Sequence, residues 1–156
     1  MPEPRPILYA TDFSPASTAA FRAAVDTARR RRRTLVIAHV VAVPVVAVGD
    51  GMTDGRTYDA LLRSIEHNAE EALDRLVRRA RARGVRARAL VLQGVPFEAI
   101  VAAARRRRAE LVVIGTHGRT GWRRLMLGSV AARVVGLAPC PVLTVGGGRR
   151  APSRAA

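Results

Sequence analysis

Short apolar runs alternate with helical patterns along almost the whole chain, and no other feature restricts the possible folds as strongly. With a helical pattern in each interval, strand-like runs occur at residues 6–11, 34–41, 85–92, 111–114 and 141–145. This alternation predicts an α/β domain in which a parallel sheet is covered by helices on both faces. The 156 residues suit one such domain, which we expect at 1–146, followed by a frayed tail at 147–156.

Local signals predict where the helices start and end. Ser14, followed by Pro15, has the side chain of an N-terminal cap, and we expect it to begin the first helix. The Gly128-Ser129 pair is expected to cap the last helix. Gly84 is expected to end the long helical pattern of residues 58–80 as a C-terminal cap.

The stretch from Leu111 to Ser129 is the strongest functional signal. A buried strand at 111–114 leads into Gly115-Thr116-His117-Gly118-Arg119, and Gly128-Ser129 then opens a helix. Glycines let a ligand approach the main chain, and a helix N-terminus attracts anions through its free N–H groups and its dipole. This arrangement predicts a phosphate site. The expected contacts are N–H groups near Gly118, Gly128 and Ser129, the Ser129 hydroxyl, and the side chains of His117 and Arg119.

Asp12 lies just past the end of the first strand, as Gly115 lies just past the fourth. The carboxyl ends of parallel strands meet at one edge of a sheet, and ligands bind there where the winding direction reverses. We therefore expect Asp12 and Gly115 to share one site. The structural alternative for Asp12 is a cap or turn residue, a common role for Asp before a helix.

The formal net charge is +15, and all 27 basic residues are arginine. The absence of lysine excludes a Walker-type phosphate loop and a lysine Schiff base. Arginine-rich runs at 29–33, 78–83 and 105–108 fall near helix C-termini, where cations compensate the helix dipole. Nucleic-acid binding is the alternative interpretation, although an aromatic content of 4% argues against base stacking. A GC-rich genome is a further hypothesis for the arginine bias.

Cys140 is the single cysteine, which excludes an intrachain disulfide, and we expect a partly buried structural thiol. The longest apolar stretch, 35–48, is interrupted by His39 and Pro44 and is too short to span a bilayer. Residues 1–5 lack the apolar core of a signal peptide. We therefore expect a soluble, cytoplasmic protein that does not contact a membrane.

The spacing Gly115-x-x-Gly118, nine residues, Gly128-Ser129 resembles the ATP-binding signature of the universal stress protein family. Residues 10–14, His39-Val40 and residues 138–142 also resemble that family, and the similarity extends from about residue 6 to residue 145. The resemblance implies a five-stranded parallel sheet of order 3-2-1-4-5 and a homodimer paired through the last strands. It also implies the ATP-binding subgroup, with ATP held between the ends of strands one and four.

The same resemblance implies a role for each site residue. Ala10, Thr11 and Asp12 would line the adenosine side, with Asp12 near adenine or ribose, and the Val40 backbone would meet the adenine. Ribose and phosphates would be surrounded by Gly115, His117, Gly118, Gly128, Ser129 and Val130, to which Arg119 is added from its charge alone. A divalent ion, Mg²⁺ or Mn²⁺, would be brought by the phosphates, and AMP or a cyclic nucleotide is an alternative ligand.

The leading hypothesis is an ATP-binding stress-response or regulatory protein that acts as a nucleotide-dependent homodimer. A slow ATP hydrolase or phosphotransferase is the first alternative. Only His117 and Asp12 are plausible bases for it, so we expect binding rather than turnover and assign no catalytic residue. The second alternative is a basic nucleic-acid-binding protein with a vestigial nucleotide pocket. His39 is predicted to make a strand-edge or core hydrogen bond, because no second ligand stands at metal spacing. His67 is predicted to be an exposed or half-buried helix residue, and Trp122 is predicted to pack over the site.

Overall fold

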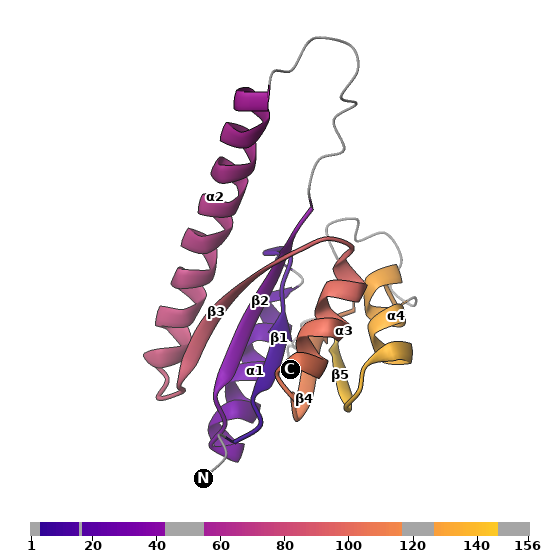
Figure 1. The fold of residues 1–156 in the computed structure, drawn as a ribbon. Helices are drawn as coiled ribbons and strands as arrows, with labels where there is room; N and C mark the ends of the chain where they lie inside the picture. The colour runs from indigo at the N-terminus through magenta and orange to yellow at the C-terminus, as the bar shows by residue number, and fades with distance from the viewer. Residues whose placement is uncertain (1–3, 16, 43–54, 117–126, 147–156) are drawn as a thin grey trace, which may run out of the picture.

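The computed structural model describes residues 4–15, 17–42, 55–116 and 127–146. Strands and helices alternate throughout these residues, as the sequence predicts (Figure 1). In chain order they are β1 Ile7–Ala10, α1 Ser17–Arg31, β2 Leu35–Val41, α2 Gly55–Arg81, β3 Ala87–Gln93, α3 Pro96–Arg106, β4 Leu111–Gly115, α4 Ser129–Leu137 and β5 Val142–Val145.

The five strands form one parallel sheet in the order β3-β2-β1-β4-β5, which confirms both the predicted sheet and its order. β1 is the central strand: Ile7 is in register with Leu35 of β2 on one side and with Leu111 of β4 on the other. The chain winds outward from β1 to β3 and then returns to β4. The winding direction therefore reverses between β1 and β4, where folds of this type bind ligands.

Helices cover both faces of the sheet, because alternate residues of each buried strand point to opposite sides. Ile7 and Tyr9 of β1 pack into the core beneath α1 and α2, whereas Leu8 and Ala10 pack into the core beneath α3 and α4. Small side chains on α1 let that helix pack closely on the sheet; they are Ala20, Ala24 and Ala28. The expectation of helices on both faces is confirmed.

Two helix starts differ from the prediction. α1 begins at Ser17, and the main-chain carbonyl of Ser14 accepts hydrogen bonds from the Ser17 N–H (3.0 Å) and hydroxyl (2.7 Å). The Ser14 hydroxyl is buried without a partner among the described residues, so the prediction that this side chain caps the helix is wrong. In α4 the cap is Gly128 alone: Ser129 is already helical, and no side chain makes a capping bond.

The predicted C-terminal cap at Gly84 is confirmed. Gly84 has φ +77°, and the next residue, Val85, donates its N–H to the Ala80 carbonyl at 3.2 Å. A positive φ is strained for a side chain with a Cβ atom, which is why glycine is favoured at this position. The turn directs the chain from α2 into β3.

Three other expectations have mixed outcomes. Cys140 is half-buried, as predicted, and burial raises the pKa of its thiol. None of the helices in the described residues is both long enough and apolar enough to cross a bilayer. The tail at 147–156 lies outside the described residues, so its frayed state stays a prediction.

Candidate functional site

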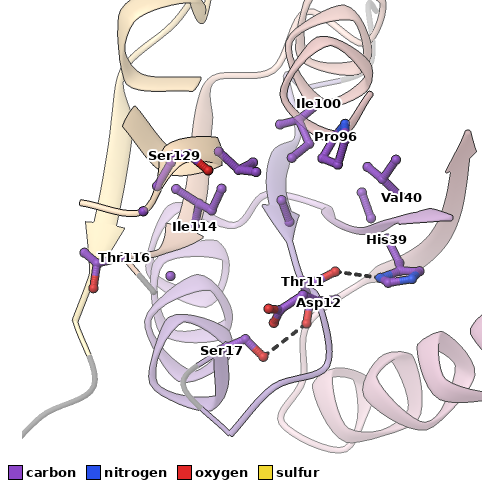
Figure 2. A pocket seen from close by; sticks show the side chains of 16 residues that line it. Thr11, Asp12, Ser17, His39, Val40, Pro96, Ile100, Ile114, Thr116 and Ser129 are labelled. Carbon is purple, nitrogen blue, oxygen red and sulfur yellow. Dashed lines mark hydrogen bonds between the residues drawn. The ribbon is translucent and has the colours of Figure 1, made fainter. Parts of the chain in front are cut away.

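A cavity of about 280 Å³ opens at the carboxyl ends of β1 and β4, where the winding direction reverses. Its volume is slightly below the range for small-molecule sites, which starts near roughly 300 Å³. Side chains from both halves of the sheet point into it (Figure 2). The lining residues are Ala10, Thr11, Asp12, Ser17, Ala38, His39, Val40, Pro96, Ile100, Ile114, Gly115, Thr116, Gly128, Ser129, Val130 and Ala131.

The cavity brings together every predicted site residue that the structure describes. These residues are Ala10, Thr11, Asp12, Val40, Gly115, Gly128, Ser129 and Val130. The remaining predicted residues, His117, Gly118 and Arg119, lie outside the described residues, as does Trp122. The expectation that Asp12 and Gly115 share one site therefore agrees with the geometry, while the ligand contacts of all these residues stay a prediction.

The turn between β1 and α1 is held by side-chain hydrogen bonds. The Thr11 hydroxyl accepts the Phe13 N–H at 3.0 Å and donates to the Ser17 hydroxyl at 3.2 Å. Phe13 has φ 61°, a strained value for a bulky residue. These bonds keep Thr11 and Asp12 at the cavity wall.

Asp12 is a turn residue, which is the structural alternative to ligand contact, and it also lines the cavity. Its Oδ1 atom accepts the Ser14 N–H at 3.0 Å, which is a turn contact typical of Asp. This bond uses one carboxylate oxygen and fixes the side chain. The two roles are compatible, because a carboxylate has a second oxygen that can accept hydrogen bonds.

Tyr9 supports the same turn from below. Its side chain is 1% exposed, and its hydroxyl donates to the Ser17 carbonyl at 2.8 Å, which holds the start of α1 against the sheet. Burial raises the pKa of the Tyr9 phenol, although hydrogen bonds with Thr11 and Ser17 oppose the shift. The hydroxyl therefore stays protonated and available as a donor at neutral pH.

The two described histidines agree with the predictions: His39 makes a hydrogen bond at the end of its strand, and His67 is an exposed helix residue. The His39 Nδ1 atom lies 2.8 Å from the Thr11 carbonyl, which can only accept, so Nδ1 carries the hydrogen (Figure 2). The ring also stacks near Phe13, with 4.3 Å between ring centroids. His67 is exposed on α2, with its Nε2 atom 3.6 Å from a Glu71 carboxylate oxygen.

The start of α4 forms the opposite wall of the cavity. The Gly128 N–H already has a partner, because it donates to the Thr116 carbonyl at 2.7 Å, and its contact with a phosphate stays a prediction. The first helical bond runs from the Ala132 N–H to the Gly128 carbonyl. The N–H groups of residues 129–131 therefore precede the helical ladder and have no main-chain partner among the described residues. In the described part of this wall, these three groups are available to an anion.

Sequence reasoning missed part of the lining. Pro96 and Ile100 of α3 form an apolar wall together with Ile114 and Val130, and Ser17 and Thr116 add polar atoms. One signal for Pro96 was available: it starts the helix after β3, and every helix in a parallel α/β unit starts at the carboxyl edge of the sheet. Which helices face the switch point depends on the strand order.

The electrostatics of the cavity favour an anion bound through main-chain groups. The first residues of α1, α3 and α4 (Ser17, Pro96 and Ser129) all line it, and each helix start carries a partial positive charge. Asp12 is the only carboxylate among the described lining residues. No group of three or more potential metal ligands occurs in the described part of the chain.

A model of the Universal stress protein family matches residues 3–146. The chain belongs to this family. It is 36% identical over 141 residues to the universal stress protein MJ0531 of Methanocaldococcus jannaschii, which covers 89% of this chain and 80% of that protein. Its fold is similar to that of the universal stress protein UspA of Lactobacillus plantarum, with a TM-score of 0.79, 25% identity, and coverage of 92% of this chain and 98% of that one.

Two similar universal stress protein structures contain adenine nucleotides. The Archaeoglobus fulgidus protein in complex with dAMP is 25% identical, with a TM-score of 0.63 and coverage of 90% of this chain and 97% of that one. A universal stress protein in complex with cAMP is 26% identical, with a TM-score of 0.64 and coverage of 90% and 96%. Adenine nucleotides are thus ligands of proteins with this fold and comparable sequence.

Proposed function

We propose that this universal stress protein binds an adenine nucleotide, with ATP as the leading candidate, in the cavity between β1 and β4. The observation that carries the proposal is the set of three N–H groups at residues 129–131, which have no main-chain partner within the part of the chain that the structure describes and which lie at an otherwise largely apolar cavity. The dAMP and cAMP complexes of similar proteins support an adenine ligand. The protein would act by holding the nucleotide as a regulatory signal.

The base and the phosphates would occupy different walls. The adenosine would lie against Ala10, Thr11, Asp12 and Val40, where apolar side chains and the Asp12 carboxylate are close together. The phosphates would lie at the start of α4, near Gly115, Gly128, Ser129 and Val130, and the predicted contacts of His117, Gly118 and Arg119 belong to the same proposal. Binding without turnover is favoured because the described lining offers a single carboxylate.

A divalent ion fits this arrangement only as a companion of the phosphates. Mg²⁺ prefers several oxygen ligands and is commonly bound through one or two carboxylates together with substrate phosphates. Asp12 is the one carboxylate in the described lining, and it is already engaged in a turn. We therefore propose that Mg²⁺ or Mn²⁺ would be held mainly by phosphate oxygens and that it would neutralise their charge.

The test is a calorimetric titration of the purified protein with ATP, AMP and cAMP, with and without Mg²⁺, after co-purified nucleotide has been removed. The key variant is Ser129→Asp. A carboxylate at the first position of a helix interacts favourably with the helix dipole and stabilises the helix. We therefore expect α4 to stay folded while the new negative charge repels the phosphates. We expect the affinity for ATP to fall roughly 100-fold, the size of a lost charge-assisted contact plus repulsion.

The matched control is Ser64→Asp, which makes the same substitution at an exposed site on α2. It should bind ATP as the unaltered protein does. Inorganic tripolyphosphate serves as a second control, because it carries the charge without the adenosine. The proposal is wrong if the unaltered protein shows no saturable ATP binding, or if tripolyphosphate binds as tightly as ATP.

We also propose that the protein is a homodimer paired through β5. The two edge strands differ: β3 carries an exposed arginine, Arg88, whereas β5 reads Val-Leu-Thr-Val without a charge. Charged side chains protect a sheet edge from pairing, and their absence leaves the edge open. Leu143 of β5 is 38% exposed, and Leu137, the last residue of α4, is 54% exposed.

Sedimentation equilibrium tests the dimer. The unaltered protein should have twice the 16.8 kDa mass of one chain, and Leu143→Arg should be monomeric. Leu61→Arg is the matched control, because Leu61 is similarly exposed, at 46%, on α2. A monomeric unaltered protein would contradict this part of the proposal and leave nucleotide binding untouched.

A further inference from the structure

Arginine side chains gather at the edge of the sheet opposite the cavity. Strands in this fold begin at that amino edge and helices end there, so the C-termini of α1, α2 and α3 come together (Figure 1). The strand register places the starts of four strands in a row: Ile7 is aligned with both Leu35 and Leu111, and Leu35 is aligned with Ala87. The residues just before these strands therefore lie side by side. We define the arginine edge as residues 29–33, 81–86 and 105–110.

The hydrogen bonds across this row connect its parts directly. The Leu35 N–H donates to the Arg86 carbonyl at 2.8 Å, and the Glu110 N–H donates to the Pro6 carbonyl at 2.8 Å. Strands are spaced about 4.8 Å apart, so the four strand starts extend across about 14 Å. That width is close to the roughly 12 Å of the B-DNA major groove, which separates phosphates on opposite strands.

The positive charge of the arginine edge is largely uncompensated. Glu110 is its one carboxylate, and it is already paired with Arg31 (2.5 Å) and Arg33 (2.6 Å). Exposed arginines at 29, 30, 32, 83, 86 and 105–108 make no ion pair among the described residues. Each helix C-terminus carries only about half a negative charge. Compensation of the helix dipoles therefore explains a small part of this charge.

The backbone supplies a second, independent observation. α1 and α3 end in the same type of turn as α2, but the position that Gly84 fills in α2 is occupied by Arg32 (φ 52°) and Arg108 (φ 50°). The hydrogen bonds match: Arg33 N–H to Ala28 carbonyl and Ala109 N–H to Ala104 carbonyl, both 2.9 Å. Arginine is conformationally unfavourable at this position and glycine is not. Codons for both residues are GC-rich, so genome composition does not account for arginine here.

We infer that the arginine edge is a docking surface for double-stranded nucleic acid, bound through its phosphate backbone without sequence preference. A duplex carries one negative charge per about 1.7 Å of its axis, which matches a dense row of exposed guanidinium groups. The arginine edge contains no aromatic side chain, so stacking of single-stranded bases has no platform there. The surface is separate from the cavity, and a nucleotide and a duplex could be bound at the same time.

The experiment measures fluorescence anisotropy of a labelled 20-base-pair duplex of random sequence, as DNA and as RNA, against increasing KCl. The test variant is Arg32→Gly with Arg108→Gly, which removes two charges while relieving backbone strain, so misfolding is not expected. The control is Arg56→Ala with Arg63→Ala, which removes the same charge from exposed positions at the other end of the molecule, on α2.

We expect the test variant to bind the duplex about 10- to 100-fold more weakly at 100 mM KCl. The slope of log K against log salt should be shallower by about 1.8, since each lost phosphate contact accounts for about 0.9. The control should lose less than about threefold. Binding of DNA, of RNA or of both supports the inference and identifies the duplex. Two results would overturn it: no duplex binding at 100 mM KCl, including the case in which phosphatidylserine vesicles are bound instead, or an equal loss of affinity in the control.

Discussion

The same four βα units form both the carboxyl edge and the amino edge of the sheet, at the two ends of the strands. The two edges differ in how they would recognise a ligand. At the carboxyl edge, helix starts and strand ends enclose a cavity whose polar atoms are mostly main-chain groups and hydroxyls held by hydrogen bonds. At the amino edge, long arginine side chains are exposed to solvent, and among the described residues Glu110 is their one acidic partner. A ligand at the first edge is selected by shape and hydrogen-bond geometry, and a ligand at the second is selected by charge.

Salt should separate the two edges most strongly. Duplex binding at the arginine edge should weaken by about 10³-fold or more between 50 and 200 mM KCl, provided that six or more phosphates are contacted. ATP binding in the cavity should change less than about tenfold, because buried hydrogen bonds are screened less than exposed charges. Parallel titrations of both ligands over that range would check this. Equal salt dependence would mean that ATP also binds through exposed arginines.

Tyr9→Phe should perturb the carboxyl edge alone. The variant removes the Tyr9 donor from the Ser17 carbonyl, which keeps its helical bond within α1, so we expect a loss of about 0.5–1.5 kcal/mol of unfolding free energy. The start of α1 should loosen, and ATP binding should weaken with it. Urea unfolding and ATP titration measure the two effects, while duplex binding serves as the internal control. A variant as stable as the unaltered protein would show that this hydrogen bond does not hold the turn.

The amino edge offers a stability test of its own. Arg32→Gly and Arg108→Gly should each raise the unfolding free energy by about 1 kcal/mol, because a left-handed backbone costs about that much for a residue with a Cβ atom. Gly84→Arg should lower it by about 1–2 kcal/mol for the same reason. Thermal unfolding of the three variants checks the signs. If both arginine variants were less stable, the strain argument for a selected arginine edge would fail.

Glu110→Gln should have the smallest effect and a defined pH dependence. Hydrogen bonds from Arg33 and Arg31 hold the pKa of this carboxyl below its ordinary value of 4.5. A lowered pKa stabilises the fold above pH 4.5, and that contribution is lost as the pH falls through the folded-state pKa. Because the ion pairs are partly exposed and screened by solvent, we expect the substitution to lower the free energy of unfolding by about 0.5–1 kcal/mol at pH 7. Urea unfolding over a pH series should show the difference from the unaltered protein at pH 7, and the difference should shrink as the pH falls below 4.5.

The fold followed from the sequence to the extent that local patterns determine it. Apolar runs such as 111–114 are buried on both faces of the sheet, and that pattern is typical of parallel strands. Alternation predicts parallel strands but leaves their order open, so the order 3-2-1-4-5 came from the family resemblance. Helix starts were less predictable: Ser14 has a capping side chain, but its main-chain carbonyl receives the bonds instead.

The candidate site was predictable where it depends on strand ends. Asp12 and Gly115 follow strands that pair with each other, so their convergence follows from a parallel sheet. The contribution of Pro96 and Ile100 depends on which helix crosses the switch point, and no local pattern encodes that. The hydrogen bond from the Gly128 N–H to the Thr116 carbonyl joins the start of α4 to the end of β4. The glycine spacing alone does not specify this contact.

Hydrogen–deuterium exchange with and without ATP, at 200 mM KCl, tests most directly whether the nucleotide occupies the carboxyl edge. ATP should protect the amides of residues 11–18 and 129–131 and leave those of residues 81–86 and 105–110 unchanged. Tripolyphosphate at the same concentration should protect neither carboxyl-edge segment to that extent. Protection confined to the arginine edge, or no protection of residues 129–131, would contradict the assignment of the nucleotide site.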